Sequence, residues 1–134
     1  MMSENIFQKI IDRQLKADIV YEDDRCLAFR DTNPQAPVHV LIIPRKVIPT
    51  HDAITEADRE LVGHLQWVAA KLAAQLGLKD GYRLVINCRE QAGQTVPHLH
   101  LHLIGGREMR CRRGETPAPL TYPAPSRGLS GSKT

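Results

Sequence analysis

Three histidines, His98, His100 and His102, alternate with leucines and form the feature of the sequence best suited to chemistry. Because successive side chains of a β-strand point to opposite faces, the three imidazoles are predicted to share one face of a strand over His98–Ile104. The leucines would share the other face and anchor the strand against the core. Neighbouring imidazoles would then lie roughly 7 Å apart along the strand.

Such a row of imidazoles is suited to attack on phosphorus. A neutral imidazole is a competent nucleophile near pH 7, since its unperturbed pKa is about 6.5. A neighbouring imidazolium can stabilise the negative charge of a phosphate, and another can protonate the leaving group. We therefore predict a nucleotide hydrolase in which the middle histidine, His100, is the attacking group.

Metal binding is the alternative chemistry for this run, because histidine is a common zinc ligand. Three alternating histidines on a regular strand usually cannot converge on one ion at ligand distances of about 2 Å. A fourth histidine, His39, would be needed, and the metal would occupy the nucleophile. No metal and no other cofactor are therefore expected. His51, in a loop, and His64, on the long helix, are expected to have no catalytic role.

The first half of the chain is predicted to supply one helix and three strands. Apolar residues near helical spacing predict a short amphipathic helix over Ile6–Leu15. Strands are predicted at Ile19–Tyr21, Cys26–Arg30 and Val38–Ile43. The segment Asp31–Pro37 is predicted to be a loop, because its prolines cannot donate to a sheet ladder.

The second half contains the clearest element, a long helix over Thr55–Leu76 with leucine and valine at spacings of three and four. Thr55 and Asp58 resemble a capping box, and Gly77 is a natural terminator. A strand is predicted at Tyr82–Asn87, before the histidine strand. Antiparallel strands combined with two helices indicate an α+β fold.

Length and composition indicate one domain, residues 1–113, followed by a tail, residues 114–134. Of the 21 tail residues, 13 are Gly, Pro, Ser or Thr, a composition that cannot bury a core. From Arg107 to Thr134 there are six basic residues against two acidic ones, whereas the rest of the chain is nearly neutral. Because Tyr122 is the one aromatic residue in this basic stretch, specific nucleic-acid binding is not expected.

The cysteines are three in number and far apart, at Cys26, Cys88 and Cys111, and none belongs to a CxxC pair. This pattern fits a reducing compartment and gives little support to a cysteine-based zinc site. No stretch approaches the roughly 20 apolar residues of a membrane span. The amino terminus carries no secretory signal. A cytoplasmic location without a membrane partner is therefore expected.

The run His98–Ile104 resembles the His-φ-His-φ-His-φ-φ signature of the histidine triad (HIT) superfamily, in which φ is apolar. The resemblance covers roughly residues 5–110 and favours the Hint branch, the purine nucleoside phosphoramidases. The other segments that carry it are Phe7–Ile11, Glu22–Phe29, Pro34–His39, Gly77–Leu78, Gly81–Arg83, Gly93–Val96 and Gly105–Arg107. The resemblance implies a HIT-like half-barrel: an antiparallel five-stranded sheet with one long and one short helix.

The resemblance also implies roles for the candidate catalytic residues. His100 would attack the α-phosphorus of an adenosine or guanosine 5′-phosphoramidate, giving a nucleotidyl-histidine from which water releases the nucleoside monophosphate. His102, with the hydroxyl of Thr95, would contact the scissile nitrogen and help the amine leave. His98 would position the nucleophile, and His39 would complete the histidine cluster. The family commonly has serine at the position of Thr95.

A purine nucleotide site is implied by the same resemblance. Asp31 would accept both ribose hydroxyls, because a carboxylate offers two acceptor oxygens. Asn87 would bind on the sugar–phosphate side, and Gly93 belongs to the same expected set. The residues expected to wall the purine pocket are Phe7, Ile10, Leu15, Phe29 and Leu41.

A homodimer with sheets joined across the interface is also implied, with the helix Thr55–Leu76 and the strand Gly81–Asn87 at the contact. Two alternative functions stay open. A dinucleoside polyphosphate hydrolase of the same superfamily would use the same attack by His100 but release a nucleotide. A non-catalytic nucleotide-binding adaptor would retain the triad for binding and use the tail to dock a partner.

Overall fold

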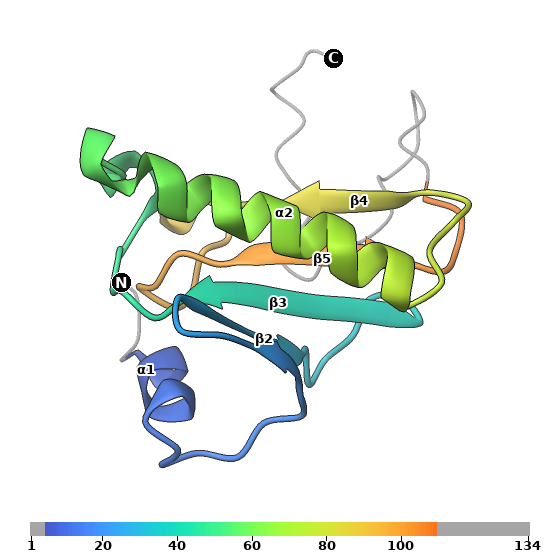
Figure 1. Cartoon of the computed structure of the whole chain (residues 1–134), viewed down its shortest axis with the longest axis horizontal. Helices are drawn as coiled ribbons and strands as arrows, with labels where there is room; N and C mark the ends of the chain where they lie inside the picture. The colour runs from blue at the N-terminus through green and yellow to red at the C-terminus, as the bar shows by residue number, and fades with distance from the viewer. Residues whose placement is uncertain (1–4, 110–134) are drawn as a thin grey trace.

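Five antiparallel strands form one sheet in the order β1-β2-β3-β5-β4 in the computed structural model, which describes residues 5–109 (Figure 1). The strands are β1 (Ile19–Glu22), β2 (Cys26–Arg30), β3 (Val38–Pro44), β4 (Tyr82–Val85) and β5 (Leu101–Gly105). The helices are α1 (Ile6–Ile11) and α2 (Arg59–Gln75), with 3-10 turns η1 (His51–Ala53), η2 (Glu56–Asp58) and η3 (Glu90–Ala92). The predicted α+β fold, with one long and one short helix, is confirmed; the predicted tail, residues 114–134, lies outside the described residues.

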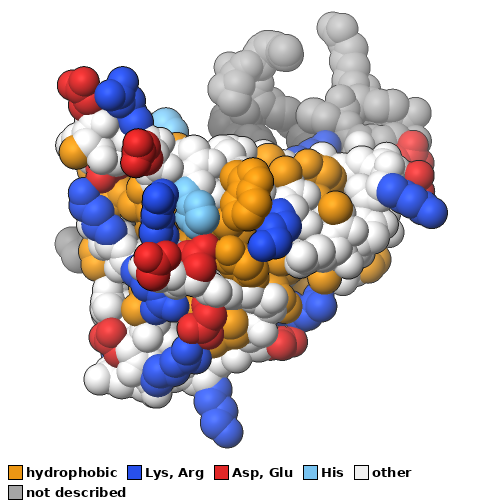
Figure 2. Space-filling view, in the orientation of Figure 1, with side chains coloured by type: hydrophobic (Ala, Val, Ile, Leu, Met, Phe, Trp, Pro, Cys, Tyr) orange, Lys and Arg blue, Asp and Glu red, His pale blue; other side chains and the backbone are white. Residues whose placement is uncertain are grey.

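Helix α2 lies across one face of the sheet (Figure 1). Its buried stripe, which includes Leu65, Val68 and Leu72, packs on Leu101 and Leu103 of β5. On the outer side of the helix, hydrophobic side chains gather at the centre of the face shown in Figure 2. Among the described residues, no helix is long and apolar enough to cross a membrane.

The ends of α2 follow from its sequence. The N–H of Thr55 donates to Oδ2 of Asp58 at 2.9 Å in a capping box that opens η2, which continues into α2. Beyond the helix, Gly77 has a φ of +80°, and the N–H of Leu78 donates to the carbonyl of Ala73 at 2.9 Å. This is the left-handed termination predicted for a glycine after the last apolar turn. The long helix is therefore confirmed, with 3-10 geometry in its first turn.

Helix α1 packs on the opposite face and is shorter than the predicted helix over Ile6–Leu15. Arg13 has a left-handed φ of 63°, and the N–H of Gln14 donates to the carbonyl of Lys9 at 2.8 Å. Because this turn ends the helix, Leu15 lies outside it and is 44% exposed. Arginine in this conformation gives no sequence signal, unlike glycine, which adopts it at no steric cost.

The predicted strand His98–Ile104 is wrong at its start, because β5 begins at Leu101. The N–H of Leu99 donates to the carbonyl of Ile48, at 2.7 Å, in the segment that follows β3. This loop contact replaces ladder pairing for residues 98–100. The predicted strands in the positions of β1, β3 and β4 differ from the observed ones by one or two residues at an end.

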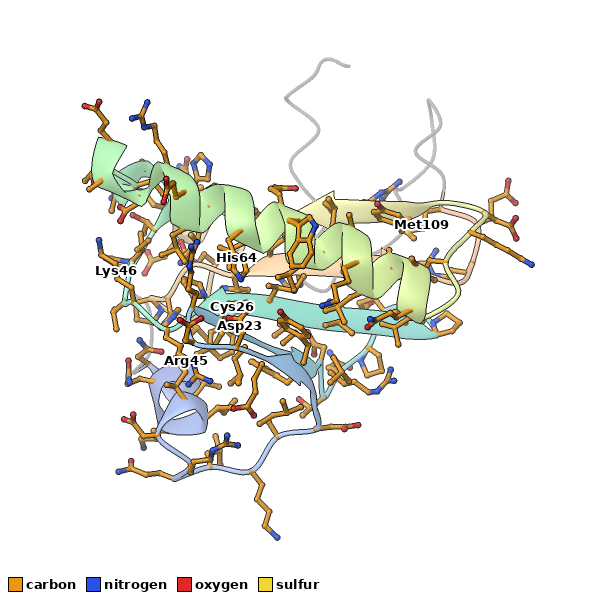
Figure 3. The ribbon with its side chains drawn as sticks, viewed as in Figure 1. Asp23, Cys26, Arg45, Lys46, His64 and Met109 are labelled. Atoms are coloured by element: carbon orange, nitrogen blue, oxygen red, sulfur yellow. The ribbon has the colours of Figure 1, made fainter. Side chains whose placement is uncertain are left out.

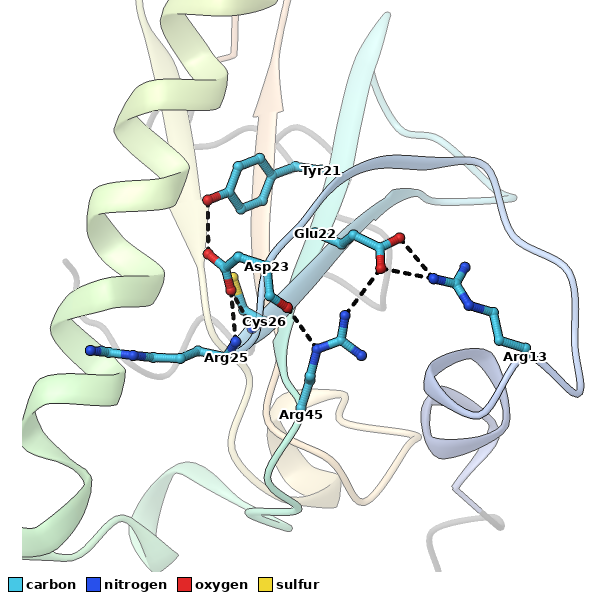
Figure 4. A network of polar contacts seen from close by, with 7 residues as sticks. All are labelled: Arg13, Tyr21, Glu22, Asp23, Arg25, Cys26 and Arg45. Atoms are coloured by element: carbon cyan, nitrogen blue, oxygen red, sulfur yellow. Dashed lines mark hydrogen bonds and ion pairs between the residues drawn. The ribbon is translucent and has the colours of Figure 1, made fainter.

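The turn between β1 and β2 is linked to α2 by one carboxylate, that of Asp23, which lies near His64 (Figure 3). Asp23 accepts the N–H groups of Arg25 and Cys26 and the hydroxyl of Tyr21, each at 2.8 Å (Figure 4). His64 of α2 donates from Nε2 to the same carboxylate at 2.7 Å. Burial alone would raise the pKa of Asp23, but the hydrogen bonds from Arg25, Tyr21, His64 and Cys26 together outweigh it and lower that pKa strongly. The hydrogen bond from His64 links α2 to this turn of the sheet.

Candidate active site

Four histidines meet on the face of the sheet opposite α2. His39 lies on β3 and His102 on β5, while His98 and His100 lie in the segment that leads into β5. All four side chains are buried, His100 with 7% of its surface exposed and the others with less. The ring centroids of His102 and His100 are 4.9 Å apart, and those of His102 and His39 are 5.2 Å apart. The structure thus brings together the four histidines selected from the sequence.

The histidines and the alternating leucines lie on opposite faces, as predicted, although strand alternation explains only part of this arrangement. The leucines lie in the cluster beneath α2. On the other side, the ring of Phe7 in α1 lies 4.9 Å from the ring of His100 and 6.1 Å from that of His98. Since neither of these histidines belongs to β5, it is the loop contact of Leu99 that extends the alternation beyond the strand.

The hydrogen bonds of His100 determine which of its nitrogens can attack. Its Nδ1 lies 2.7 Å from the carbonyl oxygen of His98. A carbonyl can only accept, so Nδ1 carries the proton. Burial lowers the pKa of His100, which keeps the ring neutral at pH 7. The lone pair of the neutral ring is therefore on Nε2, and this nitrogen is the nucleophilic one.

Both ring nitrogens of His98 are fixed by hydrogen bonds. Its Nε2 donates to the carbonyl of Pro44 at 2.7 Å, and its Nδ1 accepts from the side-chain amide of Asn5 at 2.9 Å. Asn5 also caps α1 by accepting the N–H of Gln8 at 3.0 Å. Asn5 was not among the site residues predicted from the sequence. Its residue type, directly before a predicted helix, was a signal for the cap but not for the contact with the histidine.

His39 and His102 form a hydrogen-bonded pair of neutral rings. The backbone N–H of Gln35 donates to Nδ1 of His39 at 3.1 Å, so His39 carries its proton on Nε2. That Nε2 lies 3.0 Å from Nδ1 of His102, which therefore accepts and leaves the proton of His102 on Nε2. Burial lowers the pKa of His39, and burial with the neighbouring histidines lowers the pKa of His102 to about 2. His102 thus presents an N–H donor.

The predicted polar nucleotide contacts lie in loops around the histidines. Asp31 directly follows β2, and its Oδ2 is 3.4 Å from Nε2 of His39. Asn87 is half-buried after β4, and Gly93 ends η3 with a left-handed φ of 93°. Thr95 is exposed in the segment before the triad. Asp31 is therefore placed beside the histidines, and the binding roles of all four residues stay predictions.

Four of the five predicted wall residues pack together beside the triad. Phe7, Ile10, Phe29 and Leu41 are each buried in one cluster, where the rings of Phe7 and Phe29 meet edge to face at 5.5 Å. Leu15 does not belong to this cluster, since α1 ends before it. The cluster positions α1 against the sheet and places the ring of Phe7 at the candidate nucleophile.

Gln94 supports the loop before the triad and was not selected from the sequence. Its side-chain amide donates to the carbonyls of Pro49, at 2.7 Å, and Val96, at 2.9 Å. Its Oε1 accepts the N–H of Arg89 at 2.6 Å. The side chain is buried, with all of these partners on the backbone. A single glutamine in a loop carries no sequence signal for such a role.

Two groups of described residues hold donor atoms within 4.8 Å of one another, close enough to share a metal ion. They are Asp31, His39 and His102, and Asp23, Cys26 and His64. In the second group, burial raises the pKa of the Cys26 thiol to about 12, which disfavours the thiolate that a metal requires. In the first group, the histidine nitrogens are hydrogen-bonded to each other. The absence of a metal requirement stays a prediction.

Comparison with known proteins gives consistent matches. Residues 12–109 match the HIT domain. An uncharacterised HIT-like protein of Synechocystis is 58% identical over 107 residues, which cover 80% of this chain and 94% of that protein. The purine nucleoside phosphoramidase of Escherichia coli is 49% identical over 110 residues, covering 81% of this chain and 92% of that protein.

Solved structures agree with these sequence matches. The crystal structure of a HIT family hydrolase from Legionella pneumophila superposes with a TM-score of 0.78 at 48% identity, covering 79% of this chain and 96% of that chain. A histidine triad protein from Clostridium difficile also gives a TM-score of 0.78, at 37% identity, covering 81% of this chain and 96% of that chain.

Proposed function

The chain belongs to the HIT domain family, and on that premise we propose that it is a purine nucleoside phosphoramidase. The substrate is an adenosine or guanosine 5′-phosphoramidate, and the products are the nucleoside monophosphate and an amine. The observation that carries this proposal is the tautomer of His100. Its Nδ1–H is bonded to the carbonyl of His98, which leaves the lone pair on Nε2 to attack phosphorus.

The first chemical step transfers the nucleotidyl group to the protein. Nε2 of His100 attacks the α-phosphorus, a P–N bond forms to the imidazole, and the P–N bond to the amine breaks. The departing nitrogen leaves as the neutral amine with a proton taken up from solvent, while the N–H of Nε2 of His102 donates a hydrogen bond to it and His102 stays neutral. A fixed donor aimed at the charge that develops on the departing nitrogen stabilises the transition state.

The second step returns the protein to its starting state. Water attacks the phosphorus, and the P–N bond to His100 breaks with its electron pair returning to Nε2. A proton of the attacking water passes to solvent and balances the one that the amine took up. The nucleoside monophosphate then dissociates. Both steps use neutral histidines, which burial favours at this site.

Nucleotide binding is assigned to the loops and the apolar cluster around the histidines. Asp31 accepts the ribose hydroxyls, although its Oδ1 already accepts the N–H of Asn33 at 2.8 Å. Asn87, Gly93 and Thr95 contact the phosphate side. The purine lies against the cluster of Phe7, Ile10, Phe29 and Leu41 described above. Leu15, outside that cluster, reaches the purine from its exposed position after α1.

A homodimer formed through β4 and the outer side of α2 is part of the proposal. In the described sheet, β4 is an edge strand, and its Tyr82 and Leu84 are 42% and 37% exposed. An apolar edge strand favours pairing with another strand, here β4 of a second copy. Sedimentation of the Leu84→Arg variant tests this: a shift towards monomer supports the dimer, and an unchanged species contradicts this interface.

Product analysis separates the proposed activity from its alternatives. The protein is incubated with an adenosine 5′-phosphoramidate of an alkylamine and, separately, with a diadenosine polyphosphate, and the products are resolved by chromatography. Faster release of AMP and amine supports the phosphoramidase. Preferential cleavage of the polyphosphate would establish the other hydrolase, and binding of AMP without turnover of either substrate would favour the adaptor.

A further inference from the structure

Arg107, which follows β5, holds the loop that leads into β3. Its Nε donates to the backbone carbonyl of Gln35 at 2.9 Å. The same loop is closed at its base by the N–H of Asp31, which donates to the carbonyl of His39 at 2.9 Å. The loop has no strand pairing of its own and contains two prolines, so these contacts fix the orientation of its peptide groups.

A second observation places the segment after β5 directly against this loop. Gly106 has a φ of +95°, and a Cβ at this position would lie 3.0 Å from Cβ of Pro37. Only a residue without a side chain allows so close an approach in this conformation. The segment after β5 therefore contacts the loop at two points. Gly106 packs closely against Pro37, and Arg107 donates to the carbonyl of Gln35.

Gln35, whose carbonyl Arg107 holds, also sets the proton positions of two active-site histidines through its own N–H, which belongs to the preceding peptide group. The N–H of Gln35 donates to Nδ1 of His39, and Nε2 of His39 is bonded to Nδ1 of His102. If the loop rotated away, Nδ1 of His39 would lose its donor and either nitrogen of that ring could carry the proton. His102 would then no longer be restricted to the tautomer with its proton on Nε2.

We propose that Arg107 is a positioning residue that, through the backbone of Gln35 and through His39, keeps the proton of His102 on Nε2, where it faces the leaving group. The part that concerns the leaving group rests on the proposed phosphoramidase function. The part that concerns the tautomers rests only on the hydrogen-bond chain from Arg107 to His102.

Two substitutions isolate the hydrogen bond from the length of the side chain. Arg107→Gln places an amide N–H donor at the chain position of Nε, whereas Arg107→Met places a methyl group there. Arg59→Met, on an arginine whose side chain is 76% exposed, controls for the loss of an arginine elsewhere. All variants are prepared as the full chain, and their folding is checked by thermal unfolding.

The tautomers are read directly by long-range ¹H–¹⁵N correlation spectra of protein labelled with ¹⁵N-histidine, at pH 7.5 and without substrate. Wild type and Arg107→Gln are expected to show His39 and His102 with the proton on Nε2. Arg107→Met is expected to show a mixture of tautomers at both residues. Unchanged spectra in Arg107→Met, or equal disturbance in the Gln and Met variants, would overturn the inference.

Kinetics with the phosphoramidate supply the second measurement. Arg107→Met is expected to lower kcat by about tenfold with KM unchanged, since small misplacements of catalytic groups cost up to about 10² in rate. Arg107→Gln is expected to retain most of kcat. If both variants showed the same decrease in kcat and the same change in KM, the positioning role would be overturned. If wild type shows no turnover, the proposed function fails, while the spectra still decide the tautomer relay.

Discussion

His100 donates its Nδ1–H to the backbone carbonyl of His98 at 2.7 Å, and this contact decides which nitrogen of His100 is nucleophilic. The bond spans two residues, so the chain segment that carries the proposed nucleophile also orients it. Such a bond also holds the ring in one rotamer before substrate binds, which reduces the entropy lost at the transition state.

The first prediction concerns the pH dependence of the reaction. Burial lowers the pKa of His98, His100, His102 and His39, so the neutral forms persist below the ordinary histidine pKa of about 6.5. The rate constant kcat/KM is expected to stay level as the pH falls from 7.5 to below 6.5. Initial rates at constant ionic strength check this, and a decline centred near pH 6.5 would contradict the assignment of neutral catalytic rings.

A second prediction links the same pKa values to stability. A histidine whose pKa is lowered in the folded state takes up a proton more readily when unfolded, so its stabilisation is complete above about pH 6.5 and is lost as the pH falls further. Each such ring adds up to about 1.4 kcal/mol per pH unit to the slope. Urea unfolding between pH 5 and 7.5 measures it. A free energy of unfolding that did not change over this range would refute the burial of neutral histidines.

Two glycines of the helical region are predicted to respond oppositely to the same substitution. Gly77→Ala meets no nearby atom, but the φ of +80° strains any side chain, so stability should fall by about 1 kcal/mol. Gly63→Ala, inside α2 and also without a nearby atom, should raise stability by up to about 1 kcal/mol. Paired thermal and urea unfolding tests this, and a shift of the same sign in both variants would contradict the termination at Gly77.

A second substitution pair separates the two roles of Asn5. Asn5→Ala removes both the cap of α1 and the donor to His98, and is expected to cost about 1 to 2 kcal/mol of stability. Asn5→Ser keeps a capping oxygen but cannot reach the histidine, so it should recover only part of that loss. Urea unfolding at pH 7.5 measures both variants. Equal stability of Asn5→Ala and wild type would contradict the dual role.

Local patterns predicted much of the fold. The apolar stripe, the capping box at Thr55 and the terminator Gly77 placed α2 nearly correctly, because a helix end depends on residues close in sequence. The turn at Arg13 was not predictable in this way, because a left-handed arginine has no characteristic residue type. The start of β5 was also missed, since the contact of Leu99 with Ile48 is made by a distant loop.

The candidate site was likewise predicted only in part from the sequence. The alternation in the triad and the resemblance to the HIT superfamily selected the four histidines that the structure brings together. The residues that orient these histidines were missed, because their hydrogen bonds join residues far apart in the sequence. Asn5 and His98 are 93 positions apart, and Arg107 and Gln35 are 72 positions apart. A single sequence carries no signal for hydrogen bonds of this range.

Attack by His100 is tested by the initial rate of AMP release from an adenosine 5′-phosphoramidate of an alkylamine, with and without a metal chelator. His100→Ala is compared with wild type, and His51→Ala serves as the control because its side chain is exposed in η1, outside the histidine cluster. We predict that wild type and His51→Ala turn over the substrate at a rate that the chelator does not change, and that His100→Ala loses turnover. Substantial turnover by His100→Ala, or dependence of the wild-type rate on a metal, would contradict attack by His100.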